Sequence, residues 1–396
     1  MIQISPETQL FIREHSSDDV RTLALQAKKY PDIDMPTVIT QIAGRKVAAE
    51  KIPSWWEIEK IWYPKHLSLE QCSSEITARY KARLLQGDSL TDLTGGFGID
   101  CSFLATGFKS ATYVERQEEL CEIAAHNFPI LHLNHINVRN EDGVAYLQTM
   151  SPVDCIFLDP ARRNEHGGKT VSIADCEPNV AELEDLLLSK ASRIMIKLSP
   201  MLDLSLALKE LKHTQEVHIL SVNNECKELL ILLGQTSPAE ITIHCVNLFT
   251  KGTQEEQHFV FTREQEQRSQ CTYTDSLGDY LYEPNASLLK AGAFRSIAAA
   301  YPVRKLHPNS HLYTSDTFIE NFPGRIFRIV NQCSFNKKEV KENLADLKKA
   351  NVTVRNFPAT VAELRKRLHL TEGGDTYLFA STLNNGQKVI IRCEKV

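Results

Sequence analysis

Hydrophobic and polar positions in the middle of the chain alternate between two periods. Short runs of β-branched and apolar residues, typical of buried strands, are separated by longer stretches with the apolar spacing of helices. The predicted strands are 90–94, 111–115, 135–138, 154–158, 193–198, 217–222 and 228–233. The predicted helices are 99–107, 116–128, 142–149, 179–190 and 203–212. This alternation predicts an α/β fold in which helices cover both faces of a parallel sheet.

The end of the alternating region departs from a purely parallel pattern. The last two of these strands extend over Glu216–Val222 and Lys227–Leu233, and only the four residues N-N-E-C separate them. A parallel connection needs about a dozen residues or more, so these two strands should pair antiparallel. Two further strands are predicted at 241–248 and 258–262.

The two ends of the chain show different patterns. Up to residue 85 the sequence predicts mostly helix, with strong segments at 18–29 and 69–85. The C-terminal pattern is strand, helix, strand, helix and two strands, at 326–330, 336–350, 352–357, 360–368, 376–381 and 387–393. An N-N-G sequence between the last two strands is typical of a hairpin. We therefore expect a helical region at 1–85, an α/β domain at 86–262, a linking module at 263–323 and a small α+β domain at 324–396.

Composition places the chain among ordinary globular proteins. Of 396 residues, 42% are hydrophobic and 24% are charged. No apolar run approaches the ~20 residues that span a bilayer. The first residues, M-I-Q-I-S-P-E-T, lack the charged and apolar regions of a secretory signal. We therefore expect a cytoplasmic protein that does not enter a membrane; nothing in the sequence indicates the oligomeric state.

Cysteine spacing gives no sign of a metal site. The ten cysteines are scattered and include no C-x-x-C pair. Zinc-binding and disulfide-rich sequences both show closer, patterned cysteines. We expect free thiols and no metal.

Charge is distributed unevenly. The chain carries a net −5, but residues 324–396 hold 14 Lys and Arg against 7 Asp and Glu, a charge of +7, so the remainder carries −12. A basic module on an acidic body indicates a polyanionic partner. Solvated helix faces explain the same charges equally well.

A glycine-rich turn follows the first predicted strand. The sequence L-T-D-L-T-G-G-F-G-I-D-C at Leu90–Cys101 combines strand, turn and helix start. Such a turn brings backbone N–H groups and a helix N-terminus around one small space. A flat or negatively charged ligand suits that space.

Four carboxylates lie in or near the ends of predicted strands: Asp92, Glu115, Asp142 and Asp159. In a doubly wound sheet these strand ends meet at one crevice, and an acid at the end of the second strand binds ribose hydroxyls. Each acid alone is as readily a solvated side chain or a helix cap. Together with the glycine turn they predict a ligand site.

Two phosphate-binding interpretations fail on the residues. The dinucleotide fingerprint has glycine or alanine where this chain has Cys101, and Asp100 in the turn would repel a pyrophosphate. A P-loop is absent because no G-K-[ST] follows the glycines. An uncharged adenosine carrying a cationic centre fits an acid-rich crevice better.

These motifs resemble class I S-adenosylmethionine-dependent methyltransferases. D-L-T-G-G-F-G-I-D resembles the first motif of that family, Y-V-E-R the second, N-E-D-G the third and D-C-I-F-L-D-P-A-R the fourth. The resemblance covers about 69–235 and implies a seven-stranded Rossmann-like sheet with an antiparallel last pair. The whole chain resembles a bacterial group in which a THUMP-like, RNA-binding module follows this domain.

The resemblance implies roles for individual residues. Asp159 and Pro160 would lie beside the transferred methyl as catalytic residues. Ala161 and Arg162 depart from the D/N-P-P-x pattern and its aromatic, and Arg162, the third residue predicted to be catalytic, could instead bind a phosphate. The residues implied to bind S-adenosyl-L-methionine are Gln71, Ser74, Asp92, Gly95, Gly96, Phe97, Gly98, Glu115, Asp142 and Asp159.

The sequence therefore predicts a methyltransferase of an RNA base nitrogen, with tRNA or rRNA as partner and the basic C-terminal domain helping to bind it. Two alternatives stay open. The enzyme could methylate a protein or small molecule, or the chain could be an inactive RNA-binding relative, which the altered D-P-A-R ending allows.

Overall fold

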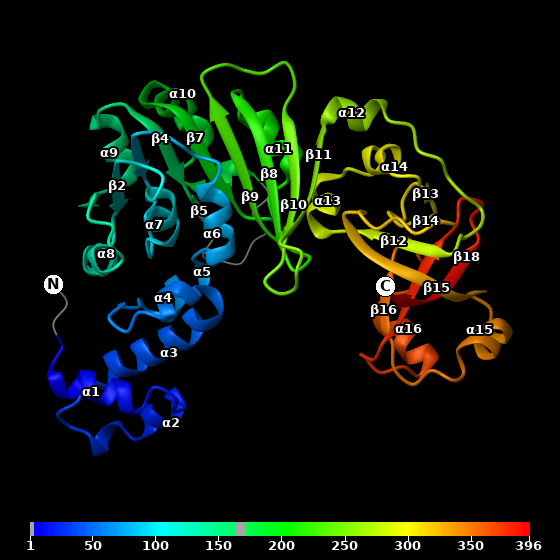
Figure 1. Ribbon diagram of the computed structural model, residues 1–396, viewed down its shortest axis with the longest axis horizontal. Coiled ribbons are helices and arrows are strands. Elements are labelled where there is room, and N and C mark those ends of the chain that lie inside the picture. Colours follow the sequence, from blue (N-terminus) through cyan, green and yellow to red (C-terminus); the bar gives the residue numbers. More distant parts are fainter. Residues whose placement is uncertain (1–3, 163–171) are drawn as a thin grey trace. The chain divides into compact units, whose positions relative to one another are not determined.

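The computed structural model describes residues 4–162 and 172–396. The chain forms two compact units, Met1–Gln215 with Leu230–Pro238, and Glu216–Leu229 with Ala239–Val396 (Figure 1). None of the described helices has both the length and the apolar character needed to cross a membrane. All ten cysteines are free, as expected, and most are buried.

The N-terminal region is helical, as predicted. Its helices are α1 (Pro6–Glu14), α2 (Val20–Leu25), the 3-10 helix Ala27–Lys29, α3 (Met35–Lys51), α4 (Pro53–Trp56), α5 (His66–Gln71) and α6 (Glu75–Ala82). The prediction of one helix over 69–85 is wrong, because the chain leaves the helix between α5 and α6. This break directs the buried Ser73 hydroxyl toward two lysines and an aspartate, contacts that outweigh local helix propensity.

The first unit contains most of a mixed sheet whose strand order is β11-β10-β8-β9-β7-β4-β1-β2-β3. Its strands are β1 (Ser89–Asp92), β2 (Ser110–Glu115), β3 (Ile136–Asn140), β4 (Val153–Leu158), β7 (Ala191–Leu198), β8 (Thr214–Val222), β9 (Glu225–Gly234), β10 (Thr242–Leu248) and β11 (Glu256–Thr262). The sheet has nine strands rather than the expected seven, because β10 pairs with β8 and extends that edge. β8 and β9 are neighbours joined by two residues with positive φ, Asn223 and Asn224, a connection that makes them antiparallel.

The helices between the strands are α7 (Ile99–Ala105), α8 (Glu118–Ile130), α9 (Gly143–Thr149), α10 (Val180–Lys190) and α11 (Leu204–Glu210). The strand order runs outward from β1 to β3 and then returns to β4, next to β1. Right-handed crossovers place α7 and α8 on one face and the later helices on the other. The order therefore reverses between β1 and β4, and ligands of doubly wound sheets bind in the crevice expected at the carboxyl ends of the strands at such a position.

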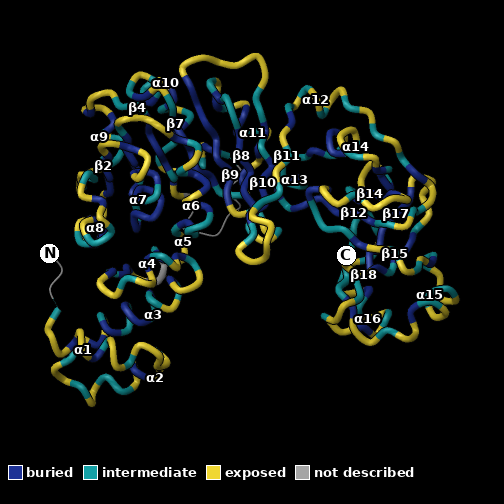
Figure 2. Tube along the Cα trace, in the orientation of Figure 1, coloured by how far each residue is buried: buried dark blue, intermediate teal, exposed yellow. Residues whose placement is uncertain are grey.

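The strands and the helices of this sheet differ in their exposure to solvent. The central strands are buried along most of their length, whereas the helices have exposed sides (Figure 2). Trp55 and Tyr63 from the helical region pack with Phe97 of the glycine turn in one apolar cluster. The N-terminal helices thus support the turn from behind.

The second unit contains another sheet, ordered β13-β14-β12-β15-β18-β17-β16. Its strands are β12 (Tyr280–Pro284), β13 (Arg304–Lys305), β14 (Tyr313–Ser315), β15 (Gly324–Ser334), β16 (Asn351–Val354), β17 (Thr376–Thr382) and β18 (Lys388–Lys395). Its helices are α12 (Arg263–Arg268), α13 (Ala286–Ala291), α14 (Ser296–Ala300), α15 (Lys337–Leu344) and α16 (Val361–Leu368). A two-stranded ribbon of β5 (Ala161–Arg162) and β6 (Cys176–Glu177) lies in the first unit, with the 3-10 helix Ile173–Asp175 before β6.

The predicted order of C-terminal elements is correct, but they do not form a separate sheet. β15 pairs antiparallel with β12 over five positions, from Tyr280–Arg328 to Pro284–Gly324. One sheet therefore continues across the expected boundary near residue 323.

Candidate active site

The glycine turn after β1 has a shape that only glycine permits at several positions. Gly96 and Gly98 have φ of +54° and +87°, and Gly98 caps α7. A Cβ on Gly95 would lie 2.2 Å from the ring of Tyr113. Among the described residues, a Cβ on Gly96 would meet only the Thr94 carbonyl oxygen, at 3.9 Å. The turn is therefore packed on the Gly95 side and open at Gly96.

Glu115 at the end of β2 lies against this turn. Its Oε2 accepts a hydrogen bond from the Gly96 N–H at 2.9 Å, and its Oε1 accepts one from the Gln117 N–H at 2.9 Å. The residue is 9% exposed. A carboxylate oxygen accepts more than one hydrogen bond, so Glu115 retains capacity for a ligand hydroxyl.

Asp92 ends β1 and is almost completely buried, at 1% exposure. Its Oδ1 accepts a hydrogen bond from the Thr94 N–H, whereas Oδ2 has no partner among the described residues. Burial raises the pKa of Asp92 well above its ordinary value, more than the Thr94 N–H lowers it. Asp92 therefore shapes the turn through its bond to the Thr94 N–H, and its burial disfavours the charged form of the carboxyl.

Two buried lysines enter this region from outside the predicted motifs. Lys81 of α6 is completely buried, and its Nζ lies 2.9 Å from Oδ1 of Asp100. Lys197 of β7 lies 3.3 Å from Oδ2 of the same carboxylate. The Ser73 hydroxyl donates to Asp100 at 2.7 Å and accepts from both lysines.

Lys81 and Lys197 determine the charge state of Asp100. Burial by itself raises the pKa of Asp100, but the Lys81 and Lys197 charges outweigh it and lower that pKa to about 2. Asp100 is therefore an ionised, fully compensated group. Because Lys81 and Lys197 compensate its charge, Asp100 would repel a pyrophosphate less than the sequence suggested. Both lysines come from segments outside the glycine motif.

Lys197 also connects the cluster to Asp159, which follows β4. The Lys197 ammonium lies 2.5 Å from Oδ2 of Asp159. The Asp159 side chain is 35% exposed, and its backbone N–H donates to the Thr94 hydroxyl at 2.6 Å. Burial raises the pKa of Asp159 and Lys197 opposes that rise. Asp159 is therefore fixed to the glycine turn with part of its carboxylate accessible.

Asp142 lies close to the turn but is used as a helix cap. Its Oδ1 accepts hydrogen bonds from the Val144 and Ala145 N–H groups at 3.0 Å. A Cβ on the adjacent Gly143 would lie 2.2 Å from the Leu93 carbonyl oxygen. The backbone approach at Gly143 therefore brings the start of α9 next to the glycine turn.

The other predicted site residues lie outside these contacts. Phe97 is 3% exposed, and its ring packs on Trp55, so only its backbone can face a ligand. Gln71 is exposed at the end of α5, and Ser74 begins α6 with its hydroxyl near that of Thr77. Pro160 is buried. Arg162 lies in β5, but its side chain is outside the described part of the chain.

Sequence reasoning missed both lysines. A usable signal was present for Lys197, the single charge in the apolar run I-M-I-K-L of β7. Buried lysines are rare unless paired, so a lysine inside a strand predicts a buried carboxylate partner. Lys81 gave no comparable signal in its polar helix.

Comparison with known proteins identifies the family. The chain is 35% identical to a provisionally assigned methyltransferase from Porphyromonas gingivalis W83, with 100% of both chains covered and a TM-score of 0.87. The chain belongs to the same family, class I methyltransferases with a C-terminal THUMP-like domain. Family models match a ferredoxin-like domain at residues 280–323 and a THUMP-like domain at residues 324–395.

More distant solved structures match only part of the chain. An rRNA methylase from Streptococcus thermophilus is 14% identical over 40% of this chain and 93% of its own, with a TM-score of 0.29. A provisionally assigned methyltransferase from Streptococcus mutans, solved with SAH, is 12% identical over 40% of this chain and 96% of its own, with a TM-score of 0.30. No curated protein matches the sequence. The family assignment therefore depends on the full-length relative.

Proposed function

We propose that this family member is an S-adenosylmethionine-dependent methyltransferase that modifies a base nitrogen of cytoplasmic tRNA or rRNA. The observation that carries the proposal is the open Gly96 turn with Glu115 on one side and the partly exposed Asp159 on the other. The buried Asp92 Oδ2 without a partner is a further atom that a ligand could satisfy. The residues present therefore fit an adenosine cofactor.

Each residue of the crevice has a distinct task in this proposal. Glu115 would hold the ribose hydroxyls, and the Gly95–Gly98 backbone would lie against the cofactor. When bound, S-adenosylmethionine supplies an activated methyl, so the protein's main contribution is alignment of the nucleophile. The Asp159 carboxylate and the Pro160 carbonyl would accept hydrogen bonds from a target amino group. Lys197, bonded to Asp159, favours the ionised carboxylate that this role needs.

Cofactor binding can be tested by isothermal titration of S-adenosylmethionine into the full chain. Glu115→Gln removes the charge and replaces one acceptor oxygen by an NH₂ donor, so binding should weaken about 10- to 100-fold, since hydrogen bonds to charged groups contribute about 1.5–3 kcal/mol. Glu122→Gln, which changes an exposed acid of α8, is the matched control and should bind as the wild type does. Equal affinity of Glu115→Gln and wild type would contradict the assigned ribose contact.

Methyl transfer is tested with radiolabelled cofactor and fractionated RNA, followed by nucleoside analysis. Asp159→Ala should reduce the rate by about 100-fold or more while leaving cofactor affinity within a fewfold of wild type. Asp185→Ala, on the exposed side of α10, is the control. If the labelled methyl appears on protein or small molecules and not on RNA, the enzyme belongs to the alternative substrate class. If the chain binds the cofactor but transfers no methyl to any of these fractions, it is an inactive relative.

The RNA part of the proposal depends on the charge of the THUMP-like domain. Its exposed cations include Lys337, Lys338 and Lys341 at α15. A triple change of these lysines to Glu should weaken RNA binding and flatten its salt dependence. The same change at the exposed Lys28, Lys29 and Lys251 alters net charge equally and should have little effect. If both triple variants bind tRNA and rRNA alike, the domain is not the RNA-binding surface.

A further inference from the structure

A cluster of three histidines and a glutamate lies on one face of the β8–β10–β11 edge. His218 of β8 and His244 of β10 are register partners in the parallel pair. Glu216 comes two residues before His218 and therefore points to the same face. On β11, His258 is two residues from Val260, the antiparallel partner of His244, so it shares that face. The sheet register thus brings together residues that no local motif connects.

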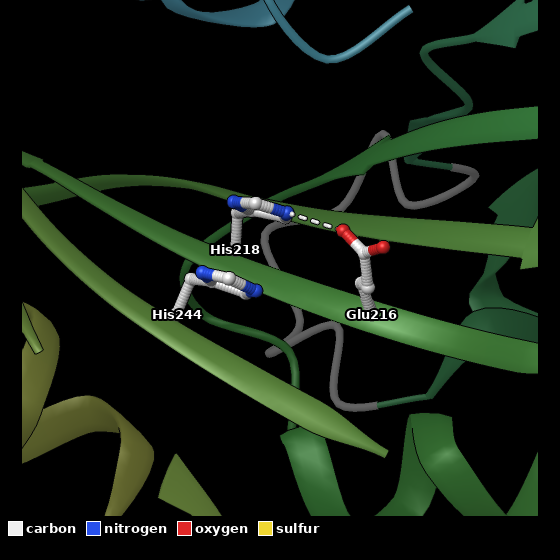
Figure 3. Close-up of side chains that lie close together, drawn as sticks. All are labelled: Glu216, His218 and His244. Carbon is white, nitrogen blue, oxygen red and sulfur yellow. Dashed lines mark hydrogen bonds and ion pairs between the residues drawn. The ribbon is translucent and has the colours of Figure 1, made fainter. Parts of the chain in front are cut away.

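The side chains of this cluster are close enough to share a ligand. One ligand atom each from Glu216, His218 and His244 lies within 4.8 Å of the other two. The His218 Nε2 is 3.3 Å from Glu216 Oε2, and the His218 and His244 rings stack at 4.2 Å with an angle of 6° (Figure 3). His218 is 3% exposed, whereas the Glu216 side chain is 33% exposed. The cluster is therefore buried at one end and accessible at the other.

His258 supports this arrangement from the next strand. His244 Nδ1 lies 3.1 Å from His258 Nε2, so one ring donates to the other. If His244 donates through Nδ1, its Nε2 keeps a lone pair for a ligand. Metal-bound histidines commonly use the other ring nitrogen in this way, and the partner fixes the tautomer and orientation of the ring.

We propose that Glu216, His218 and His244 form a zinc site, with His258 as the residue that orients His244. Two neutral imidazoles and a carboxylate, with a water in the fourth position, are a common zinc ligand set. Tetrahedral zinc needs ligand atoms about 3.3 Å apart, given Zn–N distances of about 2.0–2.1 Å. The ligand atoms, which lie within 4.8 Å of one another, must therefore move together to about this separation, and rotation of the imidazole rings about the soft χ2 torsion of histidine permits such a movement. Ca²⁺ and Mg²⁺ are disfavoured because they prefer all-oxygen sites.

The sequence led us to expect no metal, because the cysteines are scattered and include no metal-binding pair. Here the ligands come from two strands, and their proximity depends on the pairing of β8 with β10, which the sequence did not predict.

The proposal is tested by titrating Zn²⁺ into the untagged, chelator-treated full chain, with a competing chromophoric chelator as reporter. One zinc per chain is expected. His244→Gln and Glu216→Gln should each weaken binding by about 100-fold or more, and His258→Phe by about 10- to 100-fold, the range seen when an outer partner is lost. His126→Gln, which changes a partly exposed histidine bonded to the Lys60 carbonyl, is the matched control and should leave binding unchanged.

Two further measurements keep the test decisive. Thermal unfolding without metal checks that each variant is folded, and added Zn²⁺ should raise the melting temperature of the wild type and the control only. Co²⁺ substitution should give a spectrum without thiolate charge-transfer bands, which excludes zinc bound by cysteines. Absence of stoichiometric Zn²⁺ binding, or equal affinity in folded His244→Gln and wild type, would overturn the site and leave the methyltransferase proposal unaffected.

Discussion

At the scale of single residues, the crevice is governed by how buried charges compensate one another. Asp100 is ionised between Lys81 and Lys197, whereas the buried Asp92 forms no ion pair with any cation of the described residues. The two aspartates lie in the same glycine motif but have opposite pKa shifts. Their roles therefore depend on neighbours, not on their place in the motif.

Replacement of Lys81 should be strongly destabilising. Lys81→Met leaves the buried Asp100 with one fewer cation, and breaking a buried pair costs about 3–5 kcal/mol. Urea unfolding at pH 7 measures this cost, and the double change Lys81→Met with Asp100→Asn should recover much of it. Lys109→Met removes the exposed pair with Asp88 and should cost much less stability than Lys81→Met, because solvent screens an exposed pair. Equal losses at the two lysines would contradict the assigned role.

The two aspartates should affect stability with opposite dependence on pH. The pKa of Asp100 is lowered to about 2, so its contribution is present above pH 3.8 and is lost as pH falls toward 2. The pKa of Asp92 is raised, so its contribution is present below pH 3.8 and is lost as pH rises. Asp92→Asn should therefore unfold at a higher temperature than wild type at pH 7, and the difference should narrow toward pH 4. If the difference in unfolding temperature between Asp92→Asn and wild type instead widens as the pH falls, the pKa of Asp92 is not raised.

At the scale of elements, the strand–turn–helix unit at the start of the sheet was predictable. β1, the turn and α7 form from consecutive residues, so their hydrophobic pattern and glycines suffice to locate them. The break between α5 and α6 was not predictable. It depends on Ser73, whose hydroxyl bonds to Lys197, 124 residues away.

The glycine turn provides a test that separates stability from binding. Gly96→Ala should cost about 1 kcal/mol of stability because of its positive φ. The added methyl enters the open side of the turn and should reduce S-adenosylmethionine affinity tenfold or more. Gly386→Ala has a positive φ in open space and should show the strain without the binding loss. Calorimetric titration and urea unfolding measure the two effects, and full affinity in Gly96→Ala would place the cofactor elsewhere.

At the scale of the whole molecule, the ferredoxin-like and THUMP-like segments share one sheet. β12 of the first pairs with β15 of the second. The buried Glu283 on β12 is held by Arg325 at one oxygen and by Arg355, at 3.1 Å, at the other. The two segments are therefore joined by backbone hydrogen bonds and by a buried ionic contact.

Loss of this ionic contact should destabilise the second unit as a whole. Arg325→Met with Arg355→Met leaves Glu283, which is 2% exposed, without its cations and should cost about 3–5 kcal/mol. Adding Glu283→Gln should restore most of the loss. Arg304→Met, which removes the exposed pair with Asp316, is the control. Calorimetric unfolding gives the comparison; no recovery in the triple variant would mean that the arginines act by packing alone.

The sequence by itself determined the order of strands and helices, the glycine turn and the acids at the strand ends. These features are local, because hydrophobic period, turn residues and strand ends are properties of neighbouring residues. Only the tertiary structure decided which charges are compensated, where the predicted helix 69–85 breaks and how far the sheet extends. Those outcomes depend on contacts such as Lys197–Asp100 and His218–His244, in which sheet pairing and burial join residues distant in sequence.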